Sequence, residues 1–292
     1  MRYLAMAYCI VFVVATAPHA AQPETWTRPF PPFRVIGNLY AVGTYDLSVF
    51  LITSSDGHIL INTGLKDSVS LIQDNIESLG FHFNDIKILL TMQAHWDHTA
   101  GLAEIKQLTG ASMLATAGDS SVLEDGGFGD PHFGGRVSFT PVRVDKIISD
   151  GELIELGKTQ LTVIETPGHT VGSSSYTMRA SEAGRDYKVV IANMGTINPG
   201  KQLMINPTYP GVAEDFSETF RKQKNLEVDI WVAAHGSQYG LHKKYSAGQE
   251  YSPDVFVDPD GFLAAVERLE MLYLKQIADE QRGIQPNTNA RP

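Results

Sequence analysis

The 292-residue sequence contains a single cysteine, Cys9. One thiol cannot close a disulfide within the chain, and it cannot build a site that needs several thiolate ligands. Cys9 also lies in the N-terminal apolar segment that we predict to be a signal peptide, so a metal site of the mature chain must use histidine, carboxylate or amide side chains. Histidine is available for that purpose, since the chain has nine.

Positive charge is also scarce. The chain has 23 Lys and Arg against 33 Asp and Glu, which gives a formal net charge of −10. Such a surface repels phosphate backbones, and no block of basic residues offsets it. We therefore expect no nucleic-acid partner.

Long apolar runs are few, and the clearest one, residues 4–15, follows Arg2 near the N-terminus. A positive residue, a short apolar stretch and then small residues are typical of a secretory signal peptide. We predict a signal peptide over residues 1–20, with Ala15-Thr16-Ala17 as a fitting cleavage site and a later cut near residue 20 as the alternative. The stretch is short for a membrane span, which leaves an uncleaved anchor as the weaker reading. The mature chain is expected to be periplasmic, with no membrane association.

Strand and helix patterns alternate along the rest of the chain. Apolar segments at 35–42, 47–53 and 58–62 predict strands, and Asp56-Gly57 predicts a hairpin turn between the last two. Apolar residues at helical spacing then predict a helix capped by Asp67 and running to Leu79.

The alternation continues to the C-terminus. Further strands are predicted at 86–91, 113–116, 152–156, 160–166, 174–179, 188–193 and 229–234, and helices at 99–108 and 212–225. A closing helix is marked by Phe262, Val266, Leu269, Tyr273 and Ile277. The five glycines within 124–136 argue against regular structure there, and residues 283–292 are expected to fray. Two halves of similar plan without a linker predict one α/β domain over residues 21–292: two mixed β-sheets face to face, with helices outside (αββα).

Three of the predicted strands end at residues that bind divalent metals. One leads into Gln93-Ala94-His95-Trp96-Asp97-His98, and the other two end at His169 and His235. In the first segment alternate side chains can turn inward together while Asp97 and His98 diverge, a spacing that suits two adjacent ions. Imidazole and carboxylate without thiolate favour zinc, with iron and manganese as alternatives.

These segments resemble the metal motifs of the metallo-β-lactamase superfamily, whose αββα order the whole mature chain follows. Within it, the sequence is similar to the subclass B3 metallo-β-lactamases, and most of all to the GOB type. That similarity is carried by Gln93, Asn62-Thr63-Gly64, Ile191-Ala192-Asn193-Met194 and Asp229-Ile230-Trp231-Val232-Ala233.

The resemblance implies a ligand set and a reaction. The first metal would be held by Gln93, His95 and His169, and the second by Asp97, His98 and His235. One or two zinc ions would supply a metal-bound hydroxide that hydrolyses the amide bond of a small-molecule β-lactam, with Asp97 orienting the nucleophile. Resistance to β-lactam antibiotics would follow. Relatives are mostly monomers, so the resemblance also implies a monomer.

Two positions depart from the family pattern. Most relatives have histidine at the position of Gln93, and a neutral amide oxygen is a poorer zinc ligand than imidazole. We therefore expect weaker occupancy of the first site, with catalysis by a single ion in the second. Met194 stands where other members of the subclass place serine, and we assign it to packing. Thr196 resembles the hydroxyl position that contacts the substrate carboxylate, and Trp96 is predicted to form a wall of the site.

One further residue and two further segments are candidates for roles beside the metal centre. Asn62 is expected to support the metal loop through hydrogen bonds. The 124–136 loop either flanks the cleft and moves on substrate binding or is an ordinary surface loop. The Trp26 to Phe33 segment is an equally open candidate for a cover on the other side.

Two other functions stay open. The chain could be another hydrolase of the superfamily, acting on a lactone, a thioester or a phosphodiester, although a signal peptide argues against the cytosolic members. It could also be a non-catalytic metal-binding protein, which Gln93 as a degraded ligand would favour. Hydrolysis of β-lactams with and without a chelator separates these readings.

Overall fold

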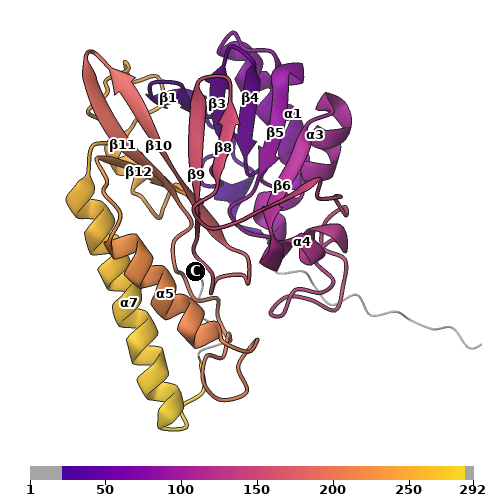
Figure 1. Cartoon of the computed structure of the whole chain (residues 1–292), viewed down its shortest axis with the longest axis vertical. Helices are drawn as coiled ribbons and strands as arrows, with labels where there is room; N and C mark the ends of the chain where they lie inside the picture. The colour runs from indigo at the N-terminus through magenta and orange to yellow at the C-terminus, as the bar shows by residue number, and fades with distance from the viewer. Residues whose placement is uncertain (1–21, 287–292) are drawn as a thin grey trace, which may run out of the picture.

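The computed structural model describes residues 22–286 (Figure 1). The predicted signal peptide at 1–20, with Cys9, and the end of the predicted frayed tail lie outside the described residues. Between residues 22 and 286 no helix has both the length and the apolarity that crossing a bilayer requires.

The N-terminal half forms a seven-stranded sheet whose spatial order is the order of the chain. Its strands are β1 (Phe33–Ile36), β2 (Leu39–Ala41), β3 (Phe50–Ser54), β4 (Gly57–Ile61), β5 (Ile86–Leu90), β6 (Ser112–Thr116) and β7 (Lys146–Ile148). The strands from β1 to β4 pair antiparallel, and those from β4 to β7 pair parallel. The sheet is therefore mixed.

The C-terminal half forms a five-stranded sheet in the order β12-β11-β10-β9-β8. Its strands are β8 (Leu153–Leu156), β9 (Thr159–Glu165), β10 (Ser174–Glu182), β11 (Arg185–Ala192) and β12 (Ile230–Ala233). The pair β11–β12 is parallel and the others are antiparallel, so this sheet is mixed as well.

The helices are α1 (Val69–Ser78), α2 (Trp96–Thr99), α3 (Leu102–Thr109), α4 (Ala117–Glu124), α5 (Val212–Lys224), α6 (Leu241–Lys244) and α7 (Pro259–Gln281), with 3-10 turns at Glu24–Trp26, Lys66–Ser68 and Phe83–Asp85. The longer helices cover the outer face of each sheet (Figure 1). In Figure 1, α1 and α3 lie beyond the first sheet, and α5 and α7 beyond the second. The predicted αββα fold is confirmed.

Alternate side chains of β4 pack into two different hydrophobic cores, one on each face of the first sheet. Ile59 and Ile61 belong to the cluster between the sheets, together with Val163 of β9. Leu60 points to the other face and joins the cluster that includes Ile72 of α1. Because successive strand residues point to opposite faces, a fully buried strand of this kind reads as a continuous apolar run.

Some predicted boundaries were wrong. The segment 35–42 is a hairpin of β1 and β2, because Gly37 takes a left-handed φ of 53° and turns the chain. The second strand begins at Phe50, not at Leu47. Asp67 lies inside a 3-10 turn, so Ser68 precedes the first residue of α1. Helix α4 and strand β7 were not predicted.

A buried carboxylate on α7 fixes the loop that follows β11. Glu280 is 3 % exposed and accepts hydrogen bonds from the backbone N–H groups of Leu203, Met204 and Ile205 at 2.6–3.3 Å. Gln276, one turn earlier, donates to the Lys201 carbonyl at 2.7 Å. The C-terminal helix thus holds the segment 201–205 by its backbone.

We expect Glu280→Ala to lower the free energy of unfolding by about 3 kcal/mol, because it leaves several backbone donors without an acceptor. Denaturant unfolding measures the change. Glu267→Ala, which removes an exposed carboxylate from the same helix, should change stability by less than about 0.5 kcal/mol. Equal stability of the two variants would contradict the anchoring role.

Candidate metal centre

Three loops at strand ends carry the predicted ligands, as the sequence indicated. Gln93 to His98 follow β5, His169 follows β9, and His235 follows β12. Hydrogen bonds join the sheets at this edge: for example, Ser174 N donates to Met92 O at 2.8 Å, and Ser48 N donates to Ala234 O at 3.0 Å. These bonds hold loops from both halves of the chain at a common point.

Asp97, His98 and His235 meet around one point. Each offers a ligand atom, and these atoms all lie within 4.8 Å of one another. Asp97 Oδ2 lies 3.4 Å from His98 Nε2 and 3.6 Å from His235 Nε2. The carboxylate and two imidazoles therefore form a group that can hold one divalent cation.

His95 and His169, predicted with Gln93 to hold the first ion, also lie together. His95 Nδ1 lies 3.1 Å from His169 Nε2. The amide oxygen of Gln93 is buried and has no hydrogen-bond partner among residues 22–286. A buried polar oxygen without a partner needs an explanation, and a cation held by Gln93, His95 and His169 would supply one.

The donor atoms fit a metal ion. His98 Nε2 is buried and, like Gln93 Oε1, unpaired in the part of the chain that the structure describes. A buried polar atom without a partner costs free energy, and a bound cation removes that cost. The set contains imidazole, carboxylate and amide ligands without thiolate, which is compatible with zinc.

Burial sets the protonation states that a metal needs. It lowers the pKa of His98 to about 4 and the pKa of His169 well below its ordinary value. Burial alone would raise the pKa of Asp97, but the charges of His98, His235 and His95 outweigh it and lower the pKa. At neutral pH His98 and His169 are therefore neutral rings beside a carboxylate, the forms that bind metal. Burial alone would lower the pKa of His235, but its hydrogen bond with Asp46 and the charges of Asp97 and Asp46 raise it.

Gly168 allows the sharp turn in the loop after β9 that directs the His169 ring toward His95. Its φ is 120°, a conformation that side chains with a Cβ rarely adopt, and a Cβ there would lie 2.7 Å from the Phe216 ring. Beyond it, His169 Nδ1 lies 2.8 Å from the Thr196 carbonyl oxygen. The ring is therefore held with Nε2 toward His95.

Asn62 supports the first loop, as predicted. Its amide oxygen accepts from Met92 N at 2.9 Å, and its amide nitrogen lies 3.4 Å from His98 Nδ1. The residue has a left-handed φ of 64°, which asparagine tolerates better than most residues.

Asp46 is a supporting residue that the sequence did not reveal. Its Oδ2 lies 3.1 Å from His235 Nδ1, and its Oδ1 accepts from Ser237 N at 2.8 Å. Burial would raise the pKa of Asp46, but the hydrogen bond and charge of His235 lower it to about 2. A carboxylate on the far nitrogen orients a metal-binding imidazole and strengthens it as a ligand.

Lys201 is a second residue that the sequence did not reveal. Its ammonium is buried and donates to the carbonyls of Gly168 and His169 at 3.1 and 2.8 Å. Burial lowers its pKa to about 8, against the opposing charges of Asp130 and Asp119. It therefore ties the His169 loop to the segment that Glu280 anchors.

The predicted walls lie beside the centre. The ring of Trp96 lies 6.4 Å from that of His95, and Trp26, from the proline-rich N-terminal segment, lies 5.7 Å from His235. Thr196 Oγ1 is 3.0 Å from His169 Nδ1, so its hydroxyl faces a predicted ligand. Its contact with substrate stays a prediction.

Met194 is buried in the core between the sheets, in agreement with the packing role assigned to it from the sequence.

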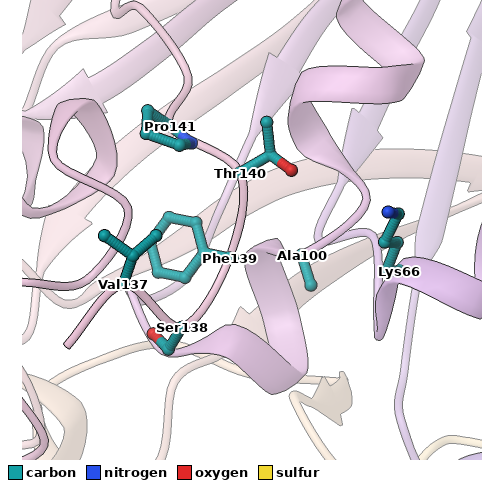
Figure 2. A pocket seen from close by; sticks show the side chains of 7 residues that line it. All are labelled: Lys66, Ala100, Val137, Ser138, Phe139, Thr140 and Pro141. Carbon is teal, nitrogen blue, oxygen red and sulfur yellow. The ribbon is translucent and has the colours of Figure 1, made fainter. Parts of the chain in front are cut away.

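The glycine-rich loop 124–136 reaches the centre. It contains turns and no strand, and its Phe133 ring lies 5.0 Å from His95 and 5.1 Å from Trp96. The residues that follow this loop, 137–141, line a pocket of about 390 Å3 together with Lys66 and Ala100 (Figure 2). None of the six predicted ligands lines this pocket, so it is separate from the metal centre.

We expect Gln93→His to raise the affinity of the first site for zinc by at least about tenfold, because imidazole is a better zinc ligand than a neutral amide. Competition with a chromophoric chelator gives the two dissociation constants separately, and turnover is measured on the same samples. If both metal content and turnover stay unchanged, Gln93 does not limit the first site.

Comparison with known proteins places the chain in a family. Residues 43–180 match the family model described as the metallo-beta-lactamase superfamily. The solved class B3 di-zinc metallo-beta-lactamase LRA-12 from an Alaskan soil metagenome is 43% identical, with a TM-score of 0.86 over 89% of this chain and 99% of that chain. The chain therefore belongs to the metallo-β-lactamase superfamily.

Its similarity within the superfamily is to class B3. The metallo-beta-lactamase GOB-18 from Elizabethkingia meningoseptica is 41% identical, with a TM-score of 0.87 over 92% of this chain and 100% of that chain. A GOB-like type, as the sequence suggested, is compatible with this match.

Curated relatives carry another name. The hydroxyacylglutathione hydrolase of Rhodospirillum rubrum is 33% identical over 37% of this chain and 34% of its own length. That of Cereibacter sphaeroides (strain ATCC 17029) is 24% identical over 66% of this chain and 64% of its own length. The chain thus spans between about a third and two thirds of these two relatives.

Proposed function

We propose that this chain is a zinc-dependent hydrolase that opens the amide bond of β-lactams. The observation that carries the proposal is the match to class B3 enzymes along nearly their whole length, combined with the convergence of Asp97, His98 and His235. The matches to hydroxyacylglutathione hydrolases are weaker and shorter.

Two groups of ligands would hold the ions. Gln93, His95 and His169 would hold the first zinc, and Asp97, His98 and His235 the second. When bound, zinc lowers the pKa of water toward 7 and acts as a Lewis acid on the substrate's oxygen and nitrogen.

The chain's own residues supply position and charge. Asp97 is ionised and buried between two imidazoles, so it can orient the attacking water by accepting a hydrogen bond. Trp96 and Phe133 on one side and Trp26 on the other would restrict access of bulk water and provide apolar contact for a substrate ring. Because the metal would activate the attacking water, the reaction needs no serine nucleophile. Ser174 and Ser175 are the first residues of β10.

A second candidate function is hydrolysis of a glutathione thioester, which the names of the curated relatives favour. Both reactions add water to an acyl carbon beside a metal centre, so the ligands alone do not separate them. The substrate test does.

The experiment compares the zinc-loaded protein on a penicillin, a cephalosporin, a carbapenem and a hydroxyacylglutathione, with Asp97→Asn as the inactive control. Chelator-sensitive opening of the β-lactam ring at a higher kcat/KM than thioester cleavage is the expected result. Thioester cleavage alone would overturn the proposal in favour of the second candidate. Bound zinc without any hydrolysis would point to a non-catalytic metal-binding protein.

We further propose that the chain is exported to the periplasm and protects its host from β-lactams. Support comes from the signal-like pattern of residues 1–20. Fractionation of expressing cells, together with their growth on a β-lactam, tests both statements.

A further inference from the structure

The two ring nitrogens of His95 face different partners. Nδ1 lies 3.1 Å from His169 Nε2, and Nε2 lies 3.3 Å from Asp130 Oδ2. Both His95 and Asp130 are buried, at 5 % and 8 % exposure. Nε2 makes no well-aligned hydrogen bond among the described residues. Asp130 Oδ2 is nevertheless close enough to accept one after a small rotation of either side chain.

The surroundings of His169 determine which nitrogen of His95 carries the proton. The Thr196 carbonyl oxygen, 2.8 Å from His169 Nδ1, can only accept, so His169 carries its proton on Nδ1. His169 Nε2 is then a bare acceptor. A hydrogen bond across the 3.1 Å between the two rings would therefore require a proton on His95 Nδ1. In that tautomer His95 cannot offer Nδ1 to a cation.

We propose that Asp130 is a positioning residue that holds His95 in its metal-binding tautomer. This inference rests on the zinc centre of the proposed function. The proton leaves Nδ1 for solvent and another is taken up at Nε2, where Asp130 Oδ2 accepts it, so the ring stays neutral. Nδ1 is then free, together with His169 Nε2 and Gln93 Oε1, to hold the first ion.

The glycine-rich loop 124–136 aims the Asp130 carboxylate. Asp130 Oδ1 accepts from the backbone N–H groups of His132 and Phe133 at 2.7 and 2.6 Å. That oxygen is fully used by the loop, which leaves Oδ2 for His95. Burial would raise the pKa of Asp130, but His95 and these two N–H groups hold it well below its usual range. The loop therefore contributes to the metal centre as well as flanking it.

Asp130→Asn reverses the hydrogen-bonding demand at one atom. The amide oxygen of the variant would keep the two backbone N–H donors, and its NH2 group would face His95 Nε2. An NH2 donor stabilises the tautomer with a bare Nε2 and a proton on Nδ1, the form that does not bind metal. The change is nearly isosteric, so the loop is expected to keep its fold.

The experiment measures zinc binding and the His95 tautomer, with no substrate present. Chelator competition on wild type and Asp130→Asn should show first-site affinity lowered by about 10- to 100-fold, with second-site affinity unchanged. At a zinc concentration that fills the first site of the wild type but not that of the variant, long-range 15N–1H NMR of the imidazole, assigned with His95→Gln, should show the proton on Nε2 in the wild type and on Nδ1 in the variant. Asp125→Asn is the matched control, since Asp125 in the same loop accepts from Gly129 N at 2.8 Å and, within residues 22–286, forms no hydrogen bond or ion pair with a predicted ligand.

Wild-type first-site affinity in Asp130→Asn would overturn the proposal. So would an equal loss at both sites, or a loss in Asp125→Asn of the same size, because either would indicate a general effect on folding. These readouts do not depend on the reaction, so failure to hydrolyse β-lactams and failure of this inference are distinguishable.

Discussion

Asp97→Asn should lower hydrolysis by about 10³-fold or more, which corresponds to about 4 kcal/mol of transition-state stabilisation. The carboxylate is the one anion in the group that it forms with His98 and His235. An amide keeps the shape but loses the charge, so both the hold on the second ion and the acceptor for the attacking water are weakened. Steady-state kcat/KM on a cephalosporin measures the loss, and metal analysis should show the second ion depleted.

Asp56→Asn is a suitable control for this substitution. Asp56 is an exposed carboxylate in the turn between β3 and β4, remote from the ligands in sequence and fold. It should keep activity within about twofold. Activity of Asp97→Asn within tenfold of wild type, at full zinc occupancy, would contradict the role given to Asp97.

Removal of zinc should lower the melting temperature by about 10 °C and abolish hydrolysis, with both restored by added zinc. A ligand at about 1,000 times its Kd stabilises the folded state by about 4 kcal/mol. For a chain of this size each kcal/mol shifts the midpoint by about 2–4 °C. Bound zinc would also give a partner to Gln93 Oε1 and His98 Nε2, which have none among the described residues. Differential scanning calorimetry at fixed free zinc measures the shift.

The zinc response should be specific. Magnesium, which prefers an all-oxygen octahedral shell, should restore neither stability nor activity. An unchanged midpoint in a chelator, with activity retained, would mean that no metal is needed for folding or for the reaction.

The ligand residues could be predicted from the sequence because each lies directly after an apolar strand. In an α/β sandwich, strand ends gather at one edge, so Gln93, His169 and His235 were expected to meet although far apart in the chain. The structure brings them to that edge through bonds that no pattern encodes, such as Ser48 N to Ala234 O.

The supporting shell could not be predicted in the same way. Asp46 and Asp130 come from loops without periodicity, and their partners His235 and His95 are distant in sequence. Only the tertiary fold decides which of 33 acidic residues lies behind an imidazole. Lys201 is similar, because a lysine in an irregular segment reads as exposed until its backbone partners are known.

The apolar pattern of the sequence did not predict helix α4, because that pattern is weak there. Helix α4 (Ala117–Glu124) has few apolar residues and includes Gly118, Asp119 and Ser120, so no apolar stripe marks it. Its stability comes from tertiary contacts: the buried Asp119 accepts from Thr170 Oγ1 and Gly172 N at 2.8 Å. The same bonds position the loop that carries His169.

The most direct test of this account is anomalous diffraction at the zinc absorption edge from crystals of the zinc-loaded protein. A peak within about 2.0–2.2 Å of Asp97, His98 and His235, the usual zinc distances for nitrogen and oxygen ligands, is the predicted result. Zinc bound elsewhere, or those three side chains free of any ion at saturating zinc, would contradict it.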